Sequence, residues 1–282
     1  MKKYLRQVIL IVLCLLVGAG TGLAENIVIK GSTTVLPIAQ AALEAYMKAN
    51  PGTKISLSGG GSGEGIKALI DNSTDIATSS REIKGSEIER AKSKGINPTA
   101  TVVAIDAIVP IVHPKNPVKD LSIDQLSQIY QGKITNWKEV GGDDLQIVVI
   151  SRDSSSGTFE SWAELVLNKA KVTPRAQLQA SSGAIVQVVS KNKYALGYIG
   201  LGYLDKTTKA LTVGGVAASA KTAISREYPI SRPLYLYTNG EAGGESAKFI
   251  RFVLSPAGQK IVAKEGFVPL ADSAKSPAKG KK

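Results

Sequence analysis

The sequence has few residues of the kinds that form disulfides and metal sites. It contains one Cys and one His among 282 residues. One Cys cannot form a disulfide within the chain, which excludes a small disulfide-stabilised scaffold. The two residues are also too few for the usual Cys and His ligand sets of zinc and iron–sulfur centres, so we expect no metal and no cofactor. A Ser-His-Asp hydrolase would depend on His113 alone.

Charge of one sign is not abundant either. The chain has 35 Lys and Arg against 23 Asp and Glu, and it is 21% charged and 43% hydrophobic. A disordered chain would have fewer apolar residues and more charge of one sign, so this composition predicts a folded protein. The length allows one large domain or two domains of about 100–150 residues.

Residues 1–24 have the pattern of a secretory signal peptide. A basic start is followed by an apolar run over 8–17 and by small residues that end at Ala24. The run is too short to span a bilayer, although a membrane anchor is the alternative interpretation. We expect cleavage after Ala24 and export to the periplasm, without lipidation, because Leu13 rather than a small residue precedes Cys14. Export counts against nucleotide cofactors and nucleic acid as ligands.

The positive charge is concentrated at the two ends of the chain. The formal net charge is +12, and removing the three cations of residues 1–24 leaves +9. Residues 273–282 contribute four lysines and no acid, so the segment 25–272 carries +5. The tail lacks apolar residues that could pack, and we expect a disordered basic segment; an adhesin or receptor that uses this tail is the alternative. A modestly positive body suits an anionic ligand.

Short β-rich runs alternate with amphipathic helical stretches along the chain. We expect strands at 26–29, 54–57, 75–78, 102–113, 146–150, 195–199 and 233–237, and helices at 36–49, 65–71, 122–131, 159–166, 184–189 and 247–254. This alternation predicts an α/β fold with mostly parallel sheets. We expect two lobes, with residues 25–108 and 228–272 in lobe 1 and residues 109–227 in lobe 2. A ligand cleft would lie between them, as in other open α/β architectures.

Three loops share one design, with hydroxyls and glycines between a strand and a helix. They are residues 31–34, 59–63 and 151–158. Unpaired backbone N–H groups at a helix N-terminus point outward, and the helix dipole adds a partial positive charge. Glycine also lets a ligand approach the backbone closely. Three such loops could surround a small tetrahedral anion, although each could instead be an ordinary N-cap.

Two arginines accompany these hydroxyl-rich loops. Arg152 lies in the third loop and could give a charged fork to an oxyanion. Arg81 follows Ser80 at the end of the strand 75–78, where it could close the same site. Catalytic alternatives fit less well: there is no P-loop and no Gly-x-Ser-x-Gly elbow. A phosphoester hydrolase with a Ser nucleophile from 154–156 would lack a base.

Five motifs together resemble one known family. They are Gly-Ser-Thr-Thr-Val-Leu-Pro at 31–37, Gly-Gly-Gly-Ser-Gly at 59–63, Gly-Lys-Ile-Thr-Asn-Trp at 132–137, the segment 152–158, and Gly-Tyr-Ile-Gly-Leu-Gly-Tyr at 197–203. Over about residues 26–272 the chain is similar to the periplasmic phosphate-binding proteins that feed the phosphate ABC transporter. The resemblance implies a type II periplasmic-binding fold, no catalysis, and a monomer that hands inorganic phosphate to a membrane permease.

The resemblance also implies which residues bind the anion. With the two arginines and the neighbouring hydroxyls, the candidates are Ser32, Thr33, Thr34, Ser62, Ser80, Arg81, Arg152, Ser156, Gly157 and Thr158. Well-studied members have an Asp where this chain has Ser80. Protonated phosphate needs an acceptor and sulfate does not, so Ser80 would not repel sulfate. Asp153 or Glu64 could supply the acceptor, and another tetrahedral oxyanion such as sulfate stays an alternative ligand.

Overall fold

A computed structural model describes residues 26–270 of the chain. Nine strands form one sheet in the order β2-β1-β3-β11-β4-β8-β6-β7, with β9 also paired to β4. Their bounds are β1 (Asn26–Gly31), β2 (Lys54–Gly59), β3 (Ile76–Ser79), β4 (Pro98–Val112), β6 (Val148–Arg152), β7 (Gln177–Gln179), β8 (Ala195–Gly200), β9 (Lys209–Ala210) and β11 (Ser231–Asn239). A second, two-stranded sheet pairs β5 (Asp120–Leu121) with β10 (Thr212–Val213).

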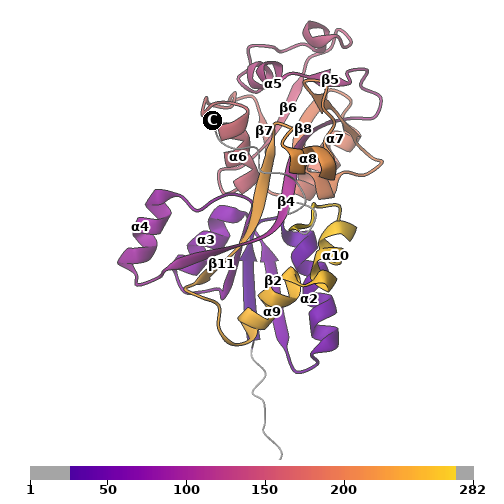
Figure 1. Cartoon of the computed structure of the whole chain (residues 1–282). Helices are drawn as coiled ribbons and strands as arrows, with labels where there is room; N and C mark the ends of the chain where they lie inside the picture. Colours follow the sequence, from indigo (N-terminus) through magenta and orange to yellow (C-terminus); the bar gives the residue numbers. More distant parts are fainter. Residues whose placement is uncertain (1–25, 271–282) are drawn as a thin grey trace, which may run out of the picture.

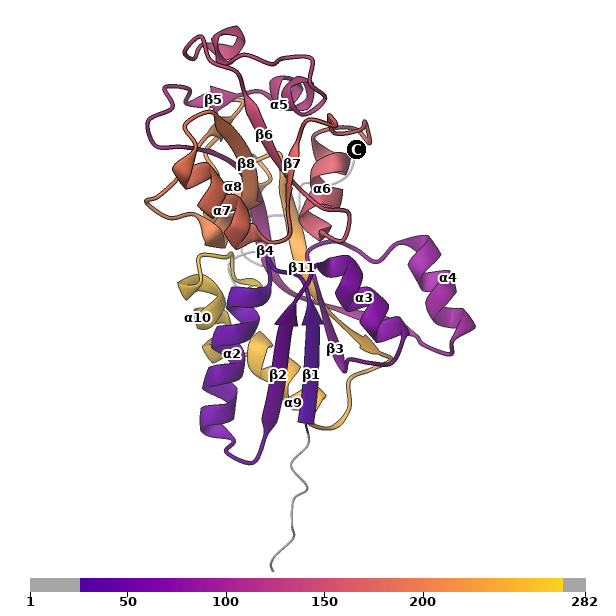
Figure 2. The same ribbon diagram turned by 180° about the vertical axis from the view of Figure 1, so that it is seen from behind.

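The first lobe is built on β1, β2 and β3, which run parallel. Its helices are α2 (Leu36–Ala49), α3 (Ser62–Ile70), α4 (Gly85–Ser93), α9 (Gly244–Leu254) and α10 (Pro256–Lys264). The helix α2 begins with Pro37 in its first turn and buries the stripe Ile38, Ala42 and Tyr46, as a 3.6-residue period requires. It lies beside β2 (Figure 2). Burial of this stripe against the sheet stabilises the helix.

The second lobe is built on β6, β7 and β8, which also run parallel. Its helices are α5 (Ile123–Tyr130), α6 (Gly157–Leu165), α7 (Ser182–Lys191) and α8 (Ala220–Ser225). Three buried aromatic rings join α5, α6 and β8: Trp162 stacks on Tyr198 with ring centroids 4.4 Å apart, and Tyr130 lies 5.0 Å from Trp162. This packing fixes the start of α6, where part of the candidate site lies.

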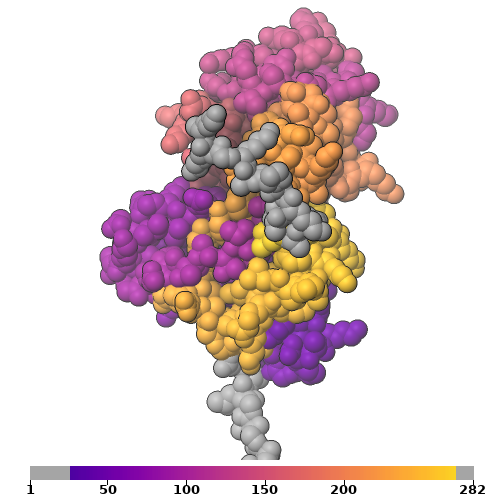
Figure 3. Space-filling model, viewed as in Figure 1, coloured from indigo at the N-terminus to yellow at the C-terminus, as the bar shows by residue number. Residues whose placement is uncertain are grey.

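Two long strands run from one lobe into the other, as Figure 1 shows for β4 and β11. The strand β4 pairs antiparallel with β11 over residues 98–107 and with β8 over 108–112. The chain therefore crosses between the lobes within hydrogen-bonded strands. In space-filling form the indigo and yellow segments of the first lobe lie below the pink and orange segments of the second (Figure 3).

The expected α/β class is confirmed, and several details differ. The antiparallel strands β4 and β11 lie in the middle of the sheet, where mostly parallel pairing was expected. The helices α4, α8 and α10 and the short strands β5, β7, β9 and β10 were not predicted. No helix within residues 26–270 is long and apolar enough to cross a membrane. The expected signal peptide, residues 1–24, and the basic tail, residues 273–282, lie outside the described residues.

Candidate anion-binding site

Helix N-termini from both lobes meet at the boundary between the lobes. Thr34, just before α2, and Thr158, in the first turn of α6, have their Oγ1 atoms 2.8 Å apart. Thr33 Oγ1 lies 3.5 Å from the Oγ of Ser182, which begins α7. Near the start of α3, Gly63 N–H donates to the carbonyl of Ser155 at 2.9 Å. Four helix starts, two from each lobe, therefore converge at one place.

Two of the predicted hydroxyls bind backbone N–H groups close to a helix start. Ser156 Oγ accepts a hydrogen bond from Phe159 N–H at 3.2 Å and so caps α6. Ser32 Oγ accepts from the N–H groups of Thr34 and Val35 at 3.2 and 3.4 Å, which closes a turn just before α2. The alternative interpretation as a cap thus applies to Ser156, whereas no side chain caps the start of α2.

The predicted residues Ser62, Ser80 and Gly157 form a close contact between the lobes. Ser62 Oγ accepts from Ser80 N–H at 3.0 Å and lies 3.3 Å from Ser80 Oγ. A Cβ on Gly157 would lie 2.3 Å from Ser62 Oγ and 2.8 Å from Ser80 Oγ. Only glycine therefore fits at this position, and its backbone at the start of α6 approaches both serines.

Arg152 is a buried cation without a carboxylate partner among the described residues. Arg152 is the last residue of β6 and is 2% exposed. Nε and Nη2 donate to the carbonyls of Gln179 and Ala180, each at 2.9 Å, and Nη1 approaches Ser182 Oγ at 3.5 Å. None of the ion pairs within residues 26–270 includes Arg152. Burial lowers the pKa of its guanidinium, and the charge of Asp153 offsets this in part.

Arg81, which was expected to close the anion site, has carboxylate partners of its own. Its guanidinium forms two 2.8 Å hydrogen bonds with Glu87 and an ion pair with Glu160 at 2.6 Å. Burial lowers the pKa of Arg81, but the bonds to Glu87 and the charge of Glu160 outweigh it, and the pKa lies above its ordinary value. Two carboxylates already neutralise this cation, so we leave Arg81 out of the proposed site.

A buried ion pair beside the hydroxyls was not foreseen from the sequence. Arg232 on β11 and Asp106 on β4 face each other across the antiparallel pair, with Arg232 Nη2 3.0 Å from Asp106 Oδ2. The same Nη2 donates to Thr158 Oγ1 at 2.9 Å and lies 3.5 Å from Thr34 Oγ1. Asp106 could be recognised in the sequence as unusual, because it is a charged residue within an apolar strand. Nothing in the sequence around Arg232, which lies just before Pro233, indicates that it is part of a buried ion pair.

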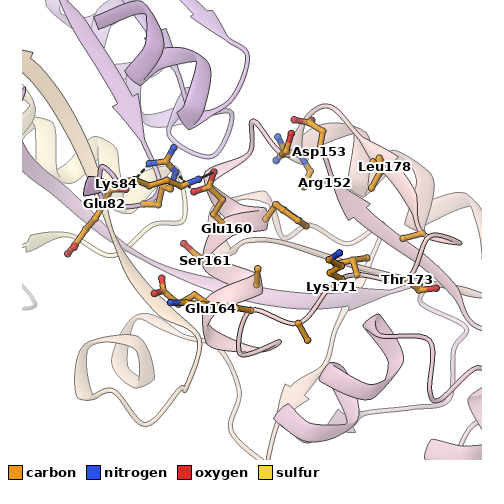
Figure 4. Close-up of a pocket in the computed structure, with 18 of the residues that line it drawn as sticks. Glu82, Lys84, Arg152, Asp153, Glu160, Ser161, Glu164, Lys171, Thr173 and Leu178 are labelled. Atoms are coloured by element: carbon orange, nitrogen blue, oxygen red, sulfur yellow. Dashed lines mark hydrogen bonds and ion pairs between the residues drawn. The ribbon is translucent and has the colours of Figure 1, made fainter. Parts of the chain in front are cut away.

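A large cavity of about 1010 Å³ lies beside the cluster and has Arg152 in its wall. Figure 4 shows Glu160 pointing toward Lys84, with Arg152 and Asp153 at another part of the wall. The wall carries cations, carboxylates and apolar side chains together, which does not suit a small inorganic anion. No group of three or more metal-ligating side chains occurs within residues 26–270.

Comparisons with known proteins give the family. The model of the PBP superfamily domain matches residues 17–257. The phosphate-binding protein PstS of Borreliella burgdorferi is 36% identical over 281 residues, covering 95% of this chain and 99% of that protein. The PstS of Bacillus subtilis is 34% identical, covering 88% of this chain and 81% of that protein. The chain belongs to the PstS family of phosphate-binding proteins.

Solved structures of PstS-like proteins have the same fold. A phosphate ABC transporter substrate-binding protein of Clostridium perfringens, solved with bound phosphate, is 40% identical with a TM-score of 0.82, covering 87% of this chain and 99% of that one. An ABC-type phosphate transport receptor of Vibrio cholerae is 32% identical with a TM-score of 0.71, covering 86% and 99%. The two-lobed type II fold expected from the motifs is therefore that of this family.

Proposed function

We propose that this protein captures inorganic phosphate between its lobes and hands it to the membrane permease of an ABC importer. The observation that carries the proposal is Arg152, a buried cation that has no carboxylate partner within residues 26–270 and lies beside Ser182, where hydroxyls of both lobes meet. An unpaired buried charge is costly unless an opposite charge arrives. The names of the relatives, which are phosphate-binding proteins, support phosphate as that charge.

The proposed ligands are donors from both lobes that lie at the boundary between the lobes. Besides Arg152 they are Thr33, Thr34, Ser62, Ser156, Gly157 and Thr158, with Ser32 and Ser80 behind them. In the structure these hydroxyls bond partly to one another, as Thr34 does with Thr158 at 2.8 Å. When an oxyanion binds, these hydroxyls would replace their contacts with one another by charge-assisted hydrogen bonds to the anion, which are stronger.

We also propose that phosphate binding drives the lobes together. Residues 25–108 with 228–272 would form one lobe and residues 109–227 the other, and each lobe supplies part of the donor set. A ligand that contacts both lobes binds the closed arrangement better than an open one and shifts the population toward it. The connecting strands β4 and β11 would then bend as the hinge.

The ligand's protonation decides selectivity between phosphate and sulfate. Neither of the two carboxylates considered as an acceptor is free to face the anion. Asp153 accepts from Ser155 N–H at 2.8 Å, and Glu64 is exposed with its carboxylate over Gly60. Asp106 is buried nearby, but its Oδ2 pairs with Arg232 and its Oδ1 accepts from Leu201 N–H, which leaves Ser80 and backbone carbonyls to accept the phosphate proton. We therefore expect weaker discrimination against sulfate than a buried carboxylate without partners would give.

Isothermal titration with phosphate, and separately with sulfate, tests the function directly. We expect heat of binding with phosphate at micromolar protein concentration and weaker binding of sulfate. The absence of binding with phosphate would overturn the proposal. Equal affinity for both anions would make the protein a general binder of tetrahedral oxyanions.

We propose further that the protein is exported, is cleaved after Ala24, and performs no catalysis. His113, just after β4, is the only histidine of the chain, and its Nδ1 accepts a hydrogen bond from Lys115 N–H at 3.1 Å. Mass spectrometry of the secreted protein should give an N-terminus at Glu25. Turnover of a chromogenic phosphomonoester, lost in Ser156→Ala, would contradict the absence of catalysis.

A further inference from the structure

Arg232 has a guanidinium nitrogen that the rest of the described protein leaves without a partner. The side chain is 6% exposed. Nε and Nη2 donate to Asp106 Oδ2 at 3.2 and 3.0 Å. Nη1 is buried and makes no hydrogen bond within residues 26–270. A buried donor without an acceptor is costly, and such an atom in a native fold calls for a ligand or a water.

The position of Arg232 places this nitrogen at the anion site. It lies on β11 directly opposite Asp106 on β4, in the two strands that connect the lobes. Its Nη2 reaches Thr158 Oγ1 of the second lobe at 2.9 Å and Thr34 Oγ1 of the first lobe at 3.5 Å. One side chain on the connecting strands thus contacts a proposed ligand residue from each lobe.

The local charge is also unbalanced in the direction of an anion. Arg152 and Arg232 are both buried, and the positive charge of Arg232 adds to the burial that lowers the pKa of Arg152. Asp106 is the one carboxylate that pairs with either of them among the described ion pairs. Two guanidinium groups and one carboxylate are buried here, whereas Asp153 beside Arg152 is only partly buried, so the buried groups carry a net positive charge beside the hydroxyls. An oxyanion would complete this arrangement.

We propose that Arg232 is a second cationic ligand of the bound oxyanion, donating through Nη1, and that Asp106 holds its guanidinium in place. The inference rests on the proposed function. With Arg232 as a ligand, the bound anion would contact the connecting strand β11 as well as both lobes. Binding would then be coupled to the geometry of β4 and β11 without any intermediate group.

Titration calorimetry with inorganic phosphate tests the inference on the mature protein. We expect Arg232→Lys, and the double variant Arg232→Met with Asp106→Asn, to weaken binding by about tenfold or more, the worth of a charged hydrogen bond. The double variant removes the donor without leaving an unpaired buried carboxylate. Arg90→Met, an exposed arginine of α4, is the matched control and should stay within about twofold of wild type.

The outcomes separate this inference from the proposed function. Wild type that fails to bind phosphate contradicts the function itself. Wild type that binds, together with a folded Arg232→Lys of the same affinity, overturns the role of Arg232. Thermal unfolding by circular dichroism shows whether each variant is folded.

The pH dependence provides a readout that a structural role would not change. Phosphate gains negative charge as the pH rises through neutrality, and a facing cation favours the more charged form. The ratio of affinities above and below neutral pH should therefore be smaller in the double variant than in wild type. A loss of affinity by the same factor at both pH values would show that Arg232 only supports the fold, and would overturn its assignment as a ligand.

Discussion

Arg81 and Arg152 are the same residue type in similar local sequences, yet their surroundings are opposite. Each lies at or just after the end of a strand, beside serines, and each side chain is buried. Arg81 contacts two carboxylates, Glu87 at 2.8 Å and Glu160 at 2.6 Å. Arg152 donates to two backbone carbonyls. One cation is neutralised by the fold, and the other has no carboxylate partner among the described residues.

The difference shows how a binding arginine is recognised. A neutralised guanidinium stabilises the folded protein but has little attraction left for a ligand. A guanidinium held by neutral carbonyls keeps its charge in a site of low dielectric, where an anion gains most from it. The comparison predicts that removal of Arg81 and removal of Arg152 affect different measurements.

The largest effect is expected for Arg152→Met. Truncating one partner of a buried, hydrogen-bonded charge pair typically costs about 2–5 kcal/mol of binding free energy, so phosphate affinity should fall by at least about tenfold. The ligand-free protein should unfold at the same temperature or a higher one, because the variant removes an unpaired buried charge. Calorimetric titration and differential scanning calorimetry measure the two quantities.

An unchanged phosphate affinity in Arg152→Met would remove this residue from the proposed site. A markedly lower unfolding temperature with unchanged affinity would reverse the comparison, since Arg152 would then be the structural arginine. Arg175→Met, an exposed arginine of the same lobe, is the control for loss of one positive charge.

Arg81→Met should instead lower stability. It leaves Glu87 and Glu160 without their common cation, and breaking a buried pair in this way costs about 3 kcal/mol. The unfolding temperature should therefore fall, while phosphate affinity changes by no more than a few-fold. A loss of phosphate affinity as large as that of Arg152→Met, in a folded variant, would restore Arg81 to the anion site.

The two arginines also show where sequence reasoning succeeds and fails. The loops 31–34, 59–63 and 151–158 were predictable, because serine, threonine and glycine between a strand and a helix are a local signal. The surroundings of Arg81 were not, because its partner Glu87 lies on α4. That helix buries only Glu87 and Ala91, too thin an apolar stripe for its periodicity to be recognised.

Contacts between residues that meet only in the folded sheet could not be predicted from the sequence either. Arg232 and Asp106 are 126 residues apart and face each other through the register of β11 on β4. Strand runs such as 102–113 predicted the class of fold, since β-branched and apolar residues mark a buried strand. Nothing local in that run indicates that its partner in the first lobe is antiparallel.

A smaller effect is expected for Glu160→Gln, which tests the contact between the lobes. Glu160 on α6 pairs with Arg81 and with Lys84 of the first lobe, the latter at 2.9 Å. Lys84 is exposed, and Arg81 keeps Glu87 as a partner when Glu160 is neutralised, so the two pairs should favour the closed arrangement by about 1 kcal/mol or less. Phosphate affinity should fall a few-fold, and the difference from wild type should shrink at high salt.

The matched control for that prediction is Glu164→Gln, an exposed carboxylate of the same helix and the same cavity wall. It should change phosphate affinity by less than Glu160→Gln does. Equal effects of the two variants would show that only net charge matters, and that the pairs of Glu160 do not hold the lobes together.

The smallest effect concerns the pH dependence of stability through Glu87. Burial raises the pKa of this carboxyl, but its hydrogen bonds to Arg81 and to Lys84 N–H outweigh burial and hold the pKa below its ordinary value. A carboxyl whose pKa is lowered by folding stabilises the protein above its unfolded pKa of about 4.3, and that stabilisation is lost as the pH falls. Urea unfolding from neutral to acid pH should show wild type and Glu87→Gln converging at the acid end. A difference that stays constant over this range would mean that Glu87 acts through packing rather than through the charge that neutralises Arg81.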